Sequence, residues 1–172
     1  DDILNGGDAD DTVTGEDGND SILGSDGYDR LLGGNGNDTI EGEKGNDVIS
    51  GGDGLDSMIG GEGDDTVDGQ TGDDTVLGGP GDDRLLGGDG DDSMQSEGGD
   101  DTFLGGAGND TIRGGADNDE LYGQEGDDVL YGEDDDDVLS GGSGNDTLDA
   151  GSGNDTVNGN SGSDQVIGDD EN

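Results

Sequence analysis

Apolar side chains recur at every ninth position of this chain, from Leu4 to Val166, without a slip or an insertion. The residues beside each of them are mostly polar, as in Thr39-Ile40-Glu41. This alternation predicts short strands that each bury one central side chain. An Asp stands two positions before every apolar residue, and glycine dominates the positions two and five before that Asp. The repeat is therefore G-x-x-G-x-D-x-U-x, in which U is apolar, and it predicts a three-residue strand followed by a six-residue turn.

One strand and one turn make half of a coil, so two repeats make a coil of 18 residues. Coils stacked about 4.8 Å apart give two parallel sheets that share a thin core. The fold class expected is therefore all-β, a solenoid on the order of 45 Å long. Because one repeat type fills the chain, we expect a single array over residues 1–172, which is a segment of a longer protein.

Successive repeats place their turns on opposite edges of such a solenoid. We call the edge of the turns that end at Asp20, Asp38 and every 18th residue onward the first edge, and the other the second edge. Complete turns of the first edge keep both glycines. All departures fall on the second edge, at Ala9, Ser96, Asp117, Asp135 and Ala150. Since Asp117 and Asp135 belong to turns that stack directly, we predict that the weakest or most altered site lies between Asp119 and Asp137.

Charge decides whether such a thin core can fold. The chain has 49 acidic and 4 basic residues, a net charge of -45 and only 22% hydrophobic residues, which is typical of a disordered polyanion. An ordered structure therefore requires a cation as a folding partner. The absence of Cys and His excludes disulfides, thiolate sites and the commonest transition-metal ligand. Four basic residues cannot form a nucleic-acid surface, no apolar run is long enough to enter a membrane, and no catalytic constellation is present.

Two segments carry a resemblance to a known family: Gly-Gly-Asn-Gly-Asn-Asp-Thr-Ile-Glu at 33–41 and Gly-Gly-Ser-Gly-Asn-Asp-Thr-Leu-Asp at 141–149. They resemble the nonapeptide repeats of RTX proteins, which bind calcium. The resemblance implies a right-handed parallel β-roll with Ca²⁺ between stacked turns, held by Asp carboxylates and backbone carbonyls. Oxygen ligands also suit Ca²⁺ on chemical grounds, whereas Mg²⁺ requires a stricter octahedron.

Carried onto this sequence, the resemblance predicts about sixteen calcium sites. The carboxylate ligands expected are those of Asp11, Asp20, Asp29, Asp38, Asp47, Asp56, Asp65, Asp74, Asp83, Asp92, Asp101, Asp110, Asp119, Asp128, Asp137, Asp146, Asp155 and Asp164. The carbonyl ligands expected are those of turn glycines such as Gly33, Gly36, Gly51, Gly54, Gly87, Gly90, Gly105, Gly108, Gly141 and Gly144. The residue directly before each Asp is not expected to bind the metal, because Tyr28 and Leu55 occupy that position without breaking the period. Its expected role is turn hydrogen bonding.

The resemblance further implies an extracellular, structural module of a bacterial protein exported by type I secretion, which folds on meeting calcium. It would have no enzymatic activity of its own. An alternative is a self-assembling filament, adhesin stalk or surface-layer protein that associates end to end. Two less favoured alternatives are an ice-binding adhesin and the non-catalytic part of a secreted toxin, protease or lipase. Flanking domains of the parent chain are then possible partners beside calcium.

Overall fold

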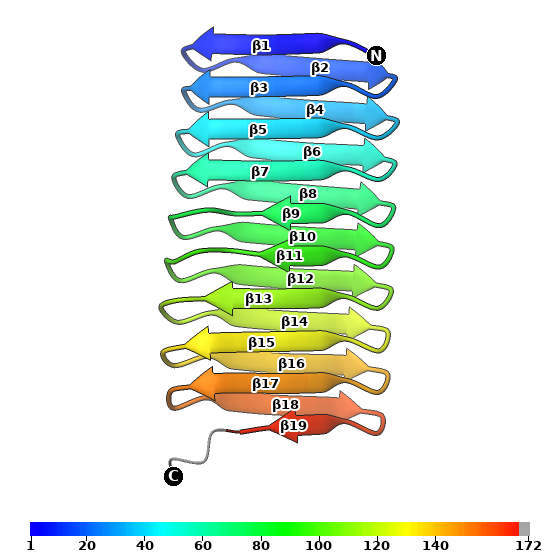
Figure 1. Ribbon diagram of the computed structural model, residues 1–172, viewed down its shortest axis with the longest axis vertical. Helices are drawn as coiled ribbons and strands as arrows, with labels where there is room; N and C mark the ends of the chain where they lie inside the picture. The colour runs from blue at the N-terminus through cyan, green and yellow to red at the C-terminus, as the bar shows by residue number, and fades with distance from the viewer. Residues whose placement is uncertain (169–172) are drawn as a thin grey trace.

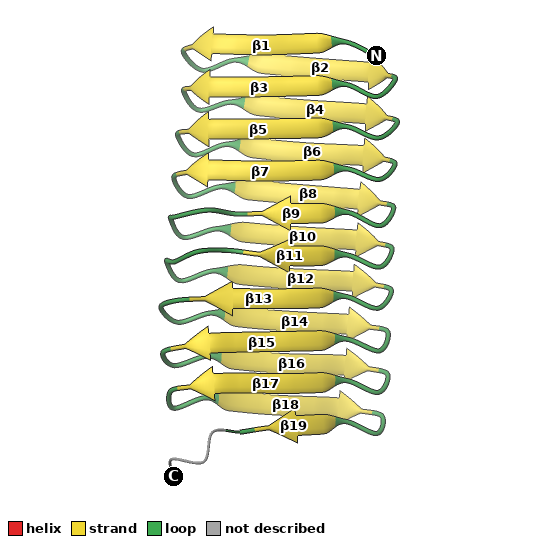
Figure 2. Cartoon of the chain, in the orientation of Figure 1, coloured by secondary structure: helices red, strands yellow, loops and turns green. Residues whose placement is uncertain are grey.

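Parallel strands wind into a right-handed solenoid in the computed structural model, which describes residues 1–168 (Figures 1 and 2). The odd-numbered strands form a 10-stranded sheet and the even-numbered strands a 9-stranded sheet. The first sheet consists of β1 (Ile3–Asp8), β3 (Ser21–Asp26), β5 (Thr39–Lys44), β7 (Ser57–Glu62), β9 (Thr75–Leu77), β11 (Ser93–Gln95), β13 (Thr111–Gly115), β15 (Val129–Asp134), β17 (Thr147–Ser152) and β19 (Gln165–Ile167). The second consists of β2 (Thr12–Asp17), β4 (Arg30–Asn35), β6 (Val48–Asp53), β8 (Thr66–Thr71), β10 (Arg84–Asp89), β12 (Thr102–Ala107), β14 (Glu120–Glu125), β16 (Val138–Ser143) and β18 (Thr156–Ser161).

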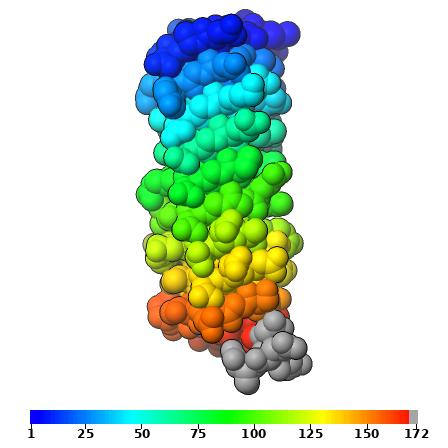
Figure 3. Space-filling model, turned by 90° about the vertical axis from the view of Figure 1, so that its left-hand side faces the viewer, coloured from blue at the N-terminus to red at the C-terminus, as the bar shows by residue number. Residues whose placement is uncertain are grey.

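The register between paired strands confirms the 18-residue coil. Leu4 pairs with Ile22 in one sheet, and Leu31 pairs with Ile49 in the other. Each residue therefore stacks on its equivalent one coil later, and the turns of each edge form a column. The molecule is correspondingly elongated, with the chain advancing steadily from one end to the other (Figure 3). The further repeat that the sequence begins at Gly168 runs into residues 169–172, which lie outside the described part of the chain.

The strands are longer than the sequence pattern predicts, and the expectation of three-residue strands is wrong. Most contain six residues, and β5 continues from Thr39 to Lys44, through the first glycine of the following turn. Burial still alternates along it, because Ile40 and Gly42 are both buried. Glycine contributes backbone hydrogen bonds to the ladder but no side chain, so the apolar pattern stops before the strand does.

The core consists of the U side chains, which meet between the two sheets. Those from Ile22 to Leu148 are at most 2% exposed, whereas Leu4, Val13 and Val157 pack against this cluster half-buried. Phe103 is the largest fully buried side chain. No helix among residues 1–168 is long and apolar enough to span a membrane.

Truncating the largest core side chain should destabilise the roll strongly. Phe103→Ala removes a fully buried ring from the thin interior, where neighbouring coils cannot move together without breaking strand pairing. We expect a loss of about 3–5 kcal/mol in the free energy of unfolding, measured with denaturant at saturating calcium. Leu104→Ala, at the half-buried outward position beside it, is the control and should cost much less. Equal losses for the two variants would contradict the assignment of the core.

Candidate metal sites between stacked turns

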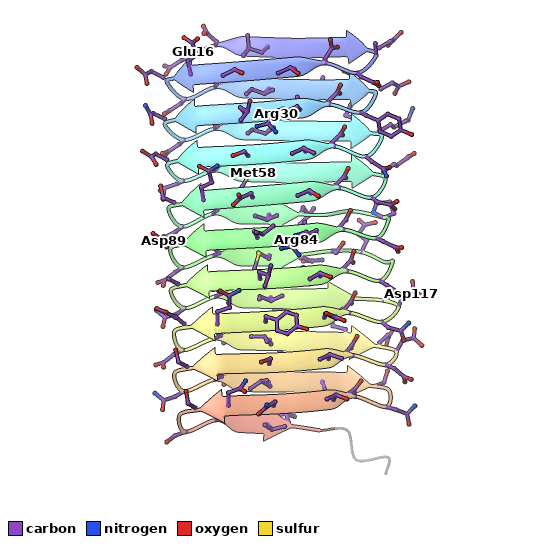
Figure 4. All side chains as sticks on the ribbon, turned by 180° about the vertical axis from the view of Figure 1, so that it is seen from behind. Glu16, Arg30, Met58, Arg84, Asp89 and Asp117 are labelled. Atoms are coloured by element: carbon purple, nitrogen blue, oxygen red, sulfur yellow. The ribbon has the colours of Figure 1, made fainter. Side chains whose placement is uncertain are left out.

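The Asp residues that stand two positions before each U residue, which we call the register Asp, lie at the two edges of the roll, and most of their side chains are buried. The fifteen from Asp20 to Asp146 are between 1% and 3% exposed, whereas Asp11, Asp155 and Asp164 are half-buried. Other acidic side chains project outward from the turns along both edges, such as Asp89 on the first edge and Asp117 on the second (Figure 4). Each edge thus carries an inner column of buried carboxylates beneath an outer layer of exposed ones.

One oxygen of each inner carboxylate is used by the fold. The backbone N–H of each register Asp donates to Oδ1 of the equivalent Asp one coil later, as from Asp38 to Asp56 and from Asp110 to Asp128, each 2.8 Å long. The chain of such bonds runs from Asp2 to Asp164 on the first edge and from Asp11 to Asp155 on the second. These bonds fix the orientation of each carboxylate, so the position of the second oxygen is fixed too.

The second oxygen, Oδ2, has no hydrogen-bond partner within residues 1–168 at fourteen of these buried positions. They are Asp20, Asp29, Asp38, Asp47, Asp56, Asp65, Asp74, Asp92, Asp101, Asp110, Asp119, Asp128, Asp137 and Asp146. Burying a charged oxygen without a partner is costly, and repeating that cost fourteen times would prevent folding. Such regular unpaired oxygens are therefore candidate ligands of a cation.

Backbone carbonyls point to the same places. A Cβ atom placed on Gly24 would lie 2.5 Å from Asp29 Oδ2 and 2.8 Å from the carbonyl oxygen of Gly42. The carboxylate of one turn and the first glycine carbonyl of the next thus converge beside Gly24, in a space that only glycine leaves open. We call the space between two stacked turns of one edge a gap.

Carbonyls enter the regular gaps from both sides, as beside Gly33 and Gly54. The first glycine of a turn directs its carbonyl toward the preceding coil, whereas the fourth-position glycine directs its carbonyl toward the following coil, as Gly36 does toward Gly54. The ten glycines predicted as ligands follow these two orientations: Gly33, Gly51, Gly87, Gly105 and Gly141 the first, and Gly36, Gly54, Gly90, Gly108 and Gly144 the second.

Burial raises the pKa of the inner carboxyl groups from Asp38 to Asp146. Desolvation is the main cause at each of these, with repulsion from neighbouring Asp carboxylates adding to it and the backbone hydrogen bond opposing it. The pKa of Asp119 rises to about 8 and those of Asp83 and Asp92 to about 7. A cation beside such a carboxylate would compensate its charge and so favour the ionised form.

The donor set fits a hard cation. Within residues 1–168, no three acidic side chains gather around one point, so the ligands available in each gap are carboxylate and carbonyl oxygens together. Ca²⁺ accepts six to eight oxygens of mixed kind in flexible geometry, and Mg²⁺ demands a strict octahedron. The oxygen donors that converge on the gaps therefore fit calcium by ligand type.

A comparison with protein families agrees. The model of the RTX calcium-binding nonapeptide repeat matches in overlapping segments at 1–31, 32–67, 59–94, 68–103, 95–130, 104–139, 114–148 and 140–172. The chain belongs to the RTX repeat family. No curated protein is similar enough in sequence to count as a match. The repeats of this family bind calcium, and the solenoid described above is an RTX β-roll.

The residue before each register Asp has the structural role that the sequence predicts. In this outer position the side-chain oxygen accepts a hydrogen bond from the backbone one coil later, as Asn19 Oδ1 does from Asn37 N–H and Asp73 Oδ1 from Asp91 N–H, both 2.9 Å. These side chains are exposed and tie neighbouring turns together. Tyr28 and Leu55 have no side-chain carbonyl or carboxylate to offer at this position, and the coils nevertheless stay in register.

Asp91 and Asp92 allow a direct test of these roles, because Asp91 occupies the outer position and Asp92 belongs to the inner column. Asp92→Asn keeps an acceptor for the Asp74 N–H but removes the charge of the unpaired oxygen, so we expect the calcium concentration at half-folding to rise severalfold, since calcium affinity depends on ligand charge. Asp91→Asn keeps the acceptor for Asn109 N–H and should change that midpoint little. Circular dichroism during calcium titration measures both. A larger effect at Asp91 would show that the outer column binds the metal.

The prediction that the most altered site lies between Asp119 and Asp137 is wrong, and the prediction that this site is the weakest stays a prediction. Asp117 and Asp135 adopt left-handed φ values of 76° and 74°, which Asp tolerates, and the Asp119 N–H still donates to Asp137 Oδ1 at 2.9 Å. The largest departure lies at Ser96, where β11 ends after three residues. The sequence shows Ser96 as a missing glycine, but not that its hydroxyl contacts Asp83.

Proposed function

We propose that this RTX β-roll is a structural module of a type I secreted bacterial protein, which stays unfolded in the calcium-poor cytosol and folds outside the cell. The observation that supports this most strongly is the row of buried, unpaired Asp oxygens, because the calcium-free chain must leave them charged and uncompensated or protonated. Calcium then provides the free energy of folding by binding the folded state alone.

The number of sites proposed follows from the stacking. Nine complete turns on each edge leave eight gaps per edge, so the roll offers about sixteen positions for calcium. Full occupancy would change the formal charge from -45 to about -13. That change removes most of the repulsion that opposes a compact state. The Asp residues of both columns are proposed as the carboxylate ligands, with the turn carbonyls completing each site.

The β-roll has a structural rather than a catalytic kind of fold, and the proposed role is accordingly that of a spacer and a folding switch. We also propose two kinds of partner beside calcium. The roll can be joined to flanking domains of the parent chain, or its open end can stack on the end of another copy. Calcium is the ligand on which the function depends.

The test is a titration of the purified chain with calcium, followed by far-UV circular dichroism, with magnesium as the control. We expect a coil-to-β transition with a midpoint in the range of about 10⁻⁴–10⁻³ M that is typical of extracellular calcium modules. Magnesium should produce no such transition. A midpoint in the nanomolar range would contradict the secretion-coupled role, because the chain would then fold before export. A chain that remains unfolded in saturating calcium would contradict calcium-driven folding itself.

A further inference from the structure

Ser96 interrupts the second edge at the position where the carbonyl-bearing glycine of a turn should stand. Its side chain is 2% exposed, and its hydroxyl lies 2.9 Å from the Gly79 carbonyl oxygen and 3.3 Å from Asp83 Oδ2. Asp83 thus differs from the fourteen other fully buried register Asp residues, whose Oδ2 atoms have no partner within residues 1–168. The single hydroxyl proton of Ser96 is thus shared between the Gly79 carbonyl oxygen and the Asp83 Oδ2 atom, whose counterparts at the other fourteen positions have no partner within residues 1–168.

The carbonyl that should face this gap points elsewhere. Beside Gly78, the Ser96 Oγ atom lies 2.7 Å from the position of a Cβ, in the place that the Gly105 carbonyl oxygen takes beside Gly87, at 2.6 Å. The Ser96 carbonyl oxygen instead lies 3.1 Å from the Cβ position of Gly115, the second residue of the turn in the following coil. The carbonyl has turned from the preceding coil toward the following one.

The other end of the same peptide unit confirms the reversal. The N–H of Glu97 donates to the Gly79 carbonyl oxygen at 3.3 Å, so a donor now points into the gap from which the carbonyl has withdrawn. The short strands β9 and β11, and the isolated bridge between Pro80 and Gly98, mark the same interruption of the ladder.

Glutamate at position 97 does not cause the reversal. Glu43 and Glu133 occupy the equivalent second turn position with left-handed φ values of 77° and 85°, whereas Glu97 is not among the residues with positive φ. The cause lies one residue earlier. A Cβ at the first turn position of an interior coil collides with the Asp of its own turn and the carbonyl of the next, as it would at Gly87. The Ser96 backbone avoids this collision by turning its peptide over.

We infer that the gap between turns 78–83 and 96–101 holds no calcium, which rests on the proposed function of the other gaps. A backbone N–H and a hydrogen-bonded hydroxyl face the space in which a cation needs oxygen lone pairs. The second edge is thereby divided into a run of four calcium sites before this junction and a run of three after it, and the first edge keeps eight. The expected total is fifteen calcium ions per chain instead of sixteen.

Ala150 provides a control in the last complete turn of the second edge, because it also replaces a first glycine. Its carbonyl oxygen keeps the regular orientation toward Gly132, and Asp137 Oδ2 in that gap has no partner within residues 1–168. Ala150 therefore leaves its gap with the regular acceptor set, and only the serine turn has lost it.

The test counts bound calcium in the folded chain by native mass spectrometry at saturating calcium. We expect fifteen ions for the wild type, sixteen for Ser96→Gly, and fifteen for Ala150→Gly. An unchanged count in Ser96→Gly, or sixteen ions in the wild type, would overturn the inference and leave calcium-driven folding intact. If none of the three proteins bound calcium, the proposed function would fail and the inference with it.

Discussion

Withdrawal of calcium by a chelator at pH 7.5 is expected to convert the roll into an expanded chain. The core is one side chain wide, and the fourteen unpaired Asp oxygens become buried charges as soon as the cations leave. A compact chain of this length has a radius of gyration of about 16 Å, somewhat more for a rod, and an unfolded one about 44 Å. Small-angle X-ray scattering before and after chelation should record this increase, and calcium in excess should reverse it.

The expansion should involve the whole chain at once, because each coil is stabilised only by its neighbours and all gaps depend on the same ion. As a control, the same chelator is added after it has been saturated with calcium. The radius of gyration should then stay unchanged. A chain that kept the scattering of a rod in excess chelator would show that hydrogen bonds and the core suffice, and that calcium is not required for the fold.

Acidification should stabilise the calcium-free roll and weaken the calcium-bound one. In the folded state burial raises the pKa of the inner Asp residues from Asp38 to Asp146, to about 6 for Asp65 and Asp128 and about 8 for Asp119, from an ordinary value of 3.8. Between these values the folded chain binds more protons than the unfolded one, so its stability increases as the pH falls. This contribution is complete below about pH 4 and is lost as the pH rises through 6 to 8.

Without calcium, β-structure measured by circular dichroism should therefore increase between pH 8 and pH 5. With calcium the trend reverses, because protons compete for the same oxygens: the calcium midpoint should rise as the pH falls, and binding should release protons. Size-exclusion chromatography controls for aggregation as the charge is neutralised. A monomeric chain that gains no β-structure on acidification would contradict the burial of these carboxyl groups.

The sequence predicts the sheets, the core and the two Asp columns because each depends on a side chain that repeats strictly. Ile40 and Asp38 are specified in this way, and both lie where the period places them. The six-residue strands could not be predicted, since the residues that extend them include glycines such as Gly42, whose pairing has no side-chain signature. The different roles of the two Asp oxygens could not be predicted either. Oδ1 accepts a backbone hydrogen bond and Oδ2 faces the gap, and both roles depend on how the coils stack, which a single repeat does not show.

The turns show why equal departures from the repeat have unequal effects. Asp at a fourth turn position replaces a glycine that is needed for its left-handed backbone, and Asp117 and Asp135 can adopt that conformation. In an interior coil, serine at a first position replaces a glycine whose missing side chain leaves the gap open, and Ser96 reverses its peptide as a result. The period identifies both as departures, but only the contacts between coils separate the tolerated change from the disruptive one.

The central claim is that calcium binds in the gaps between stacked turns. The most direct test is to locate the ions in crystals grown with calcium, from the anomalous X-ray scattering of calcium. The account predicts peaks inside the gaps along both edges, each beside an inner Asp Oδ2 and a first-position glycine carbonyl such as those of Asp38 and Gly51. Peaks confined to the exposed outer carboxylates, with the inner gaps empty in a folded roll, would contradict it.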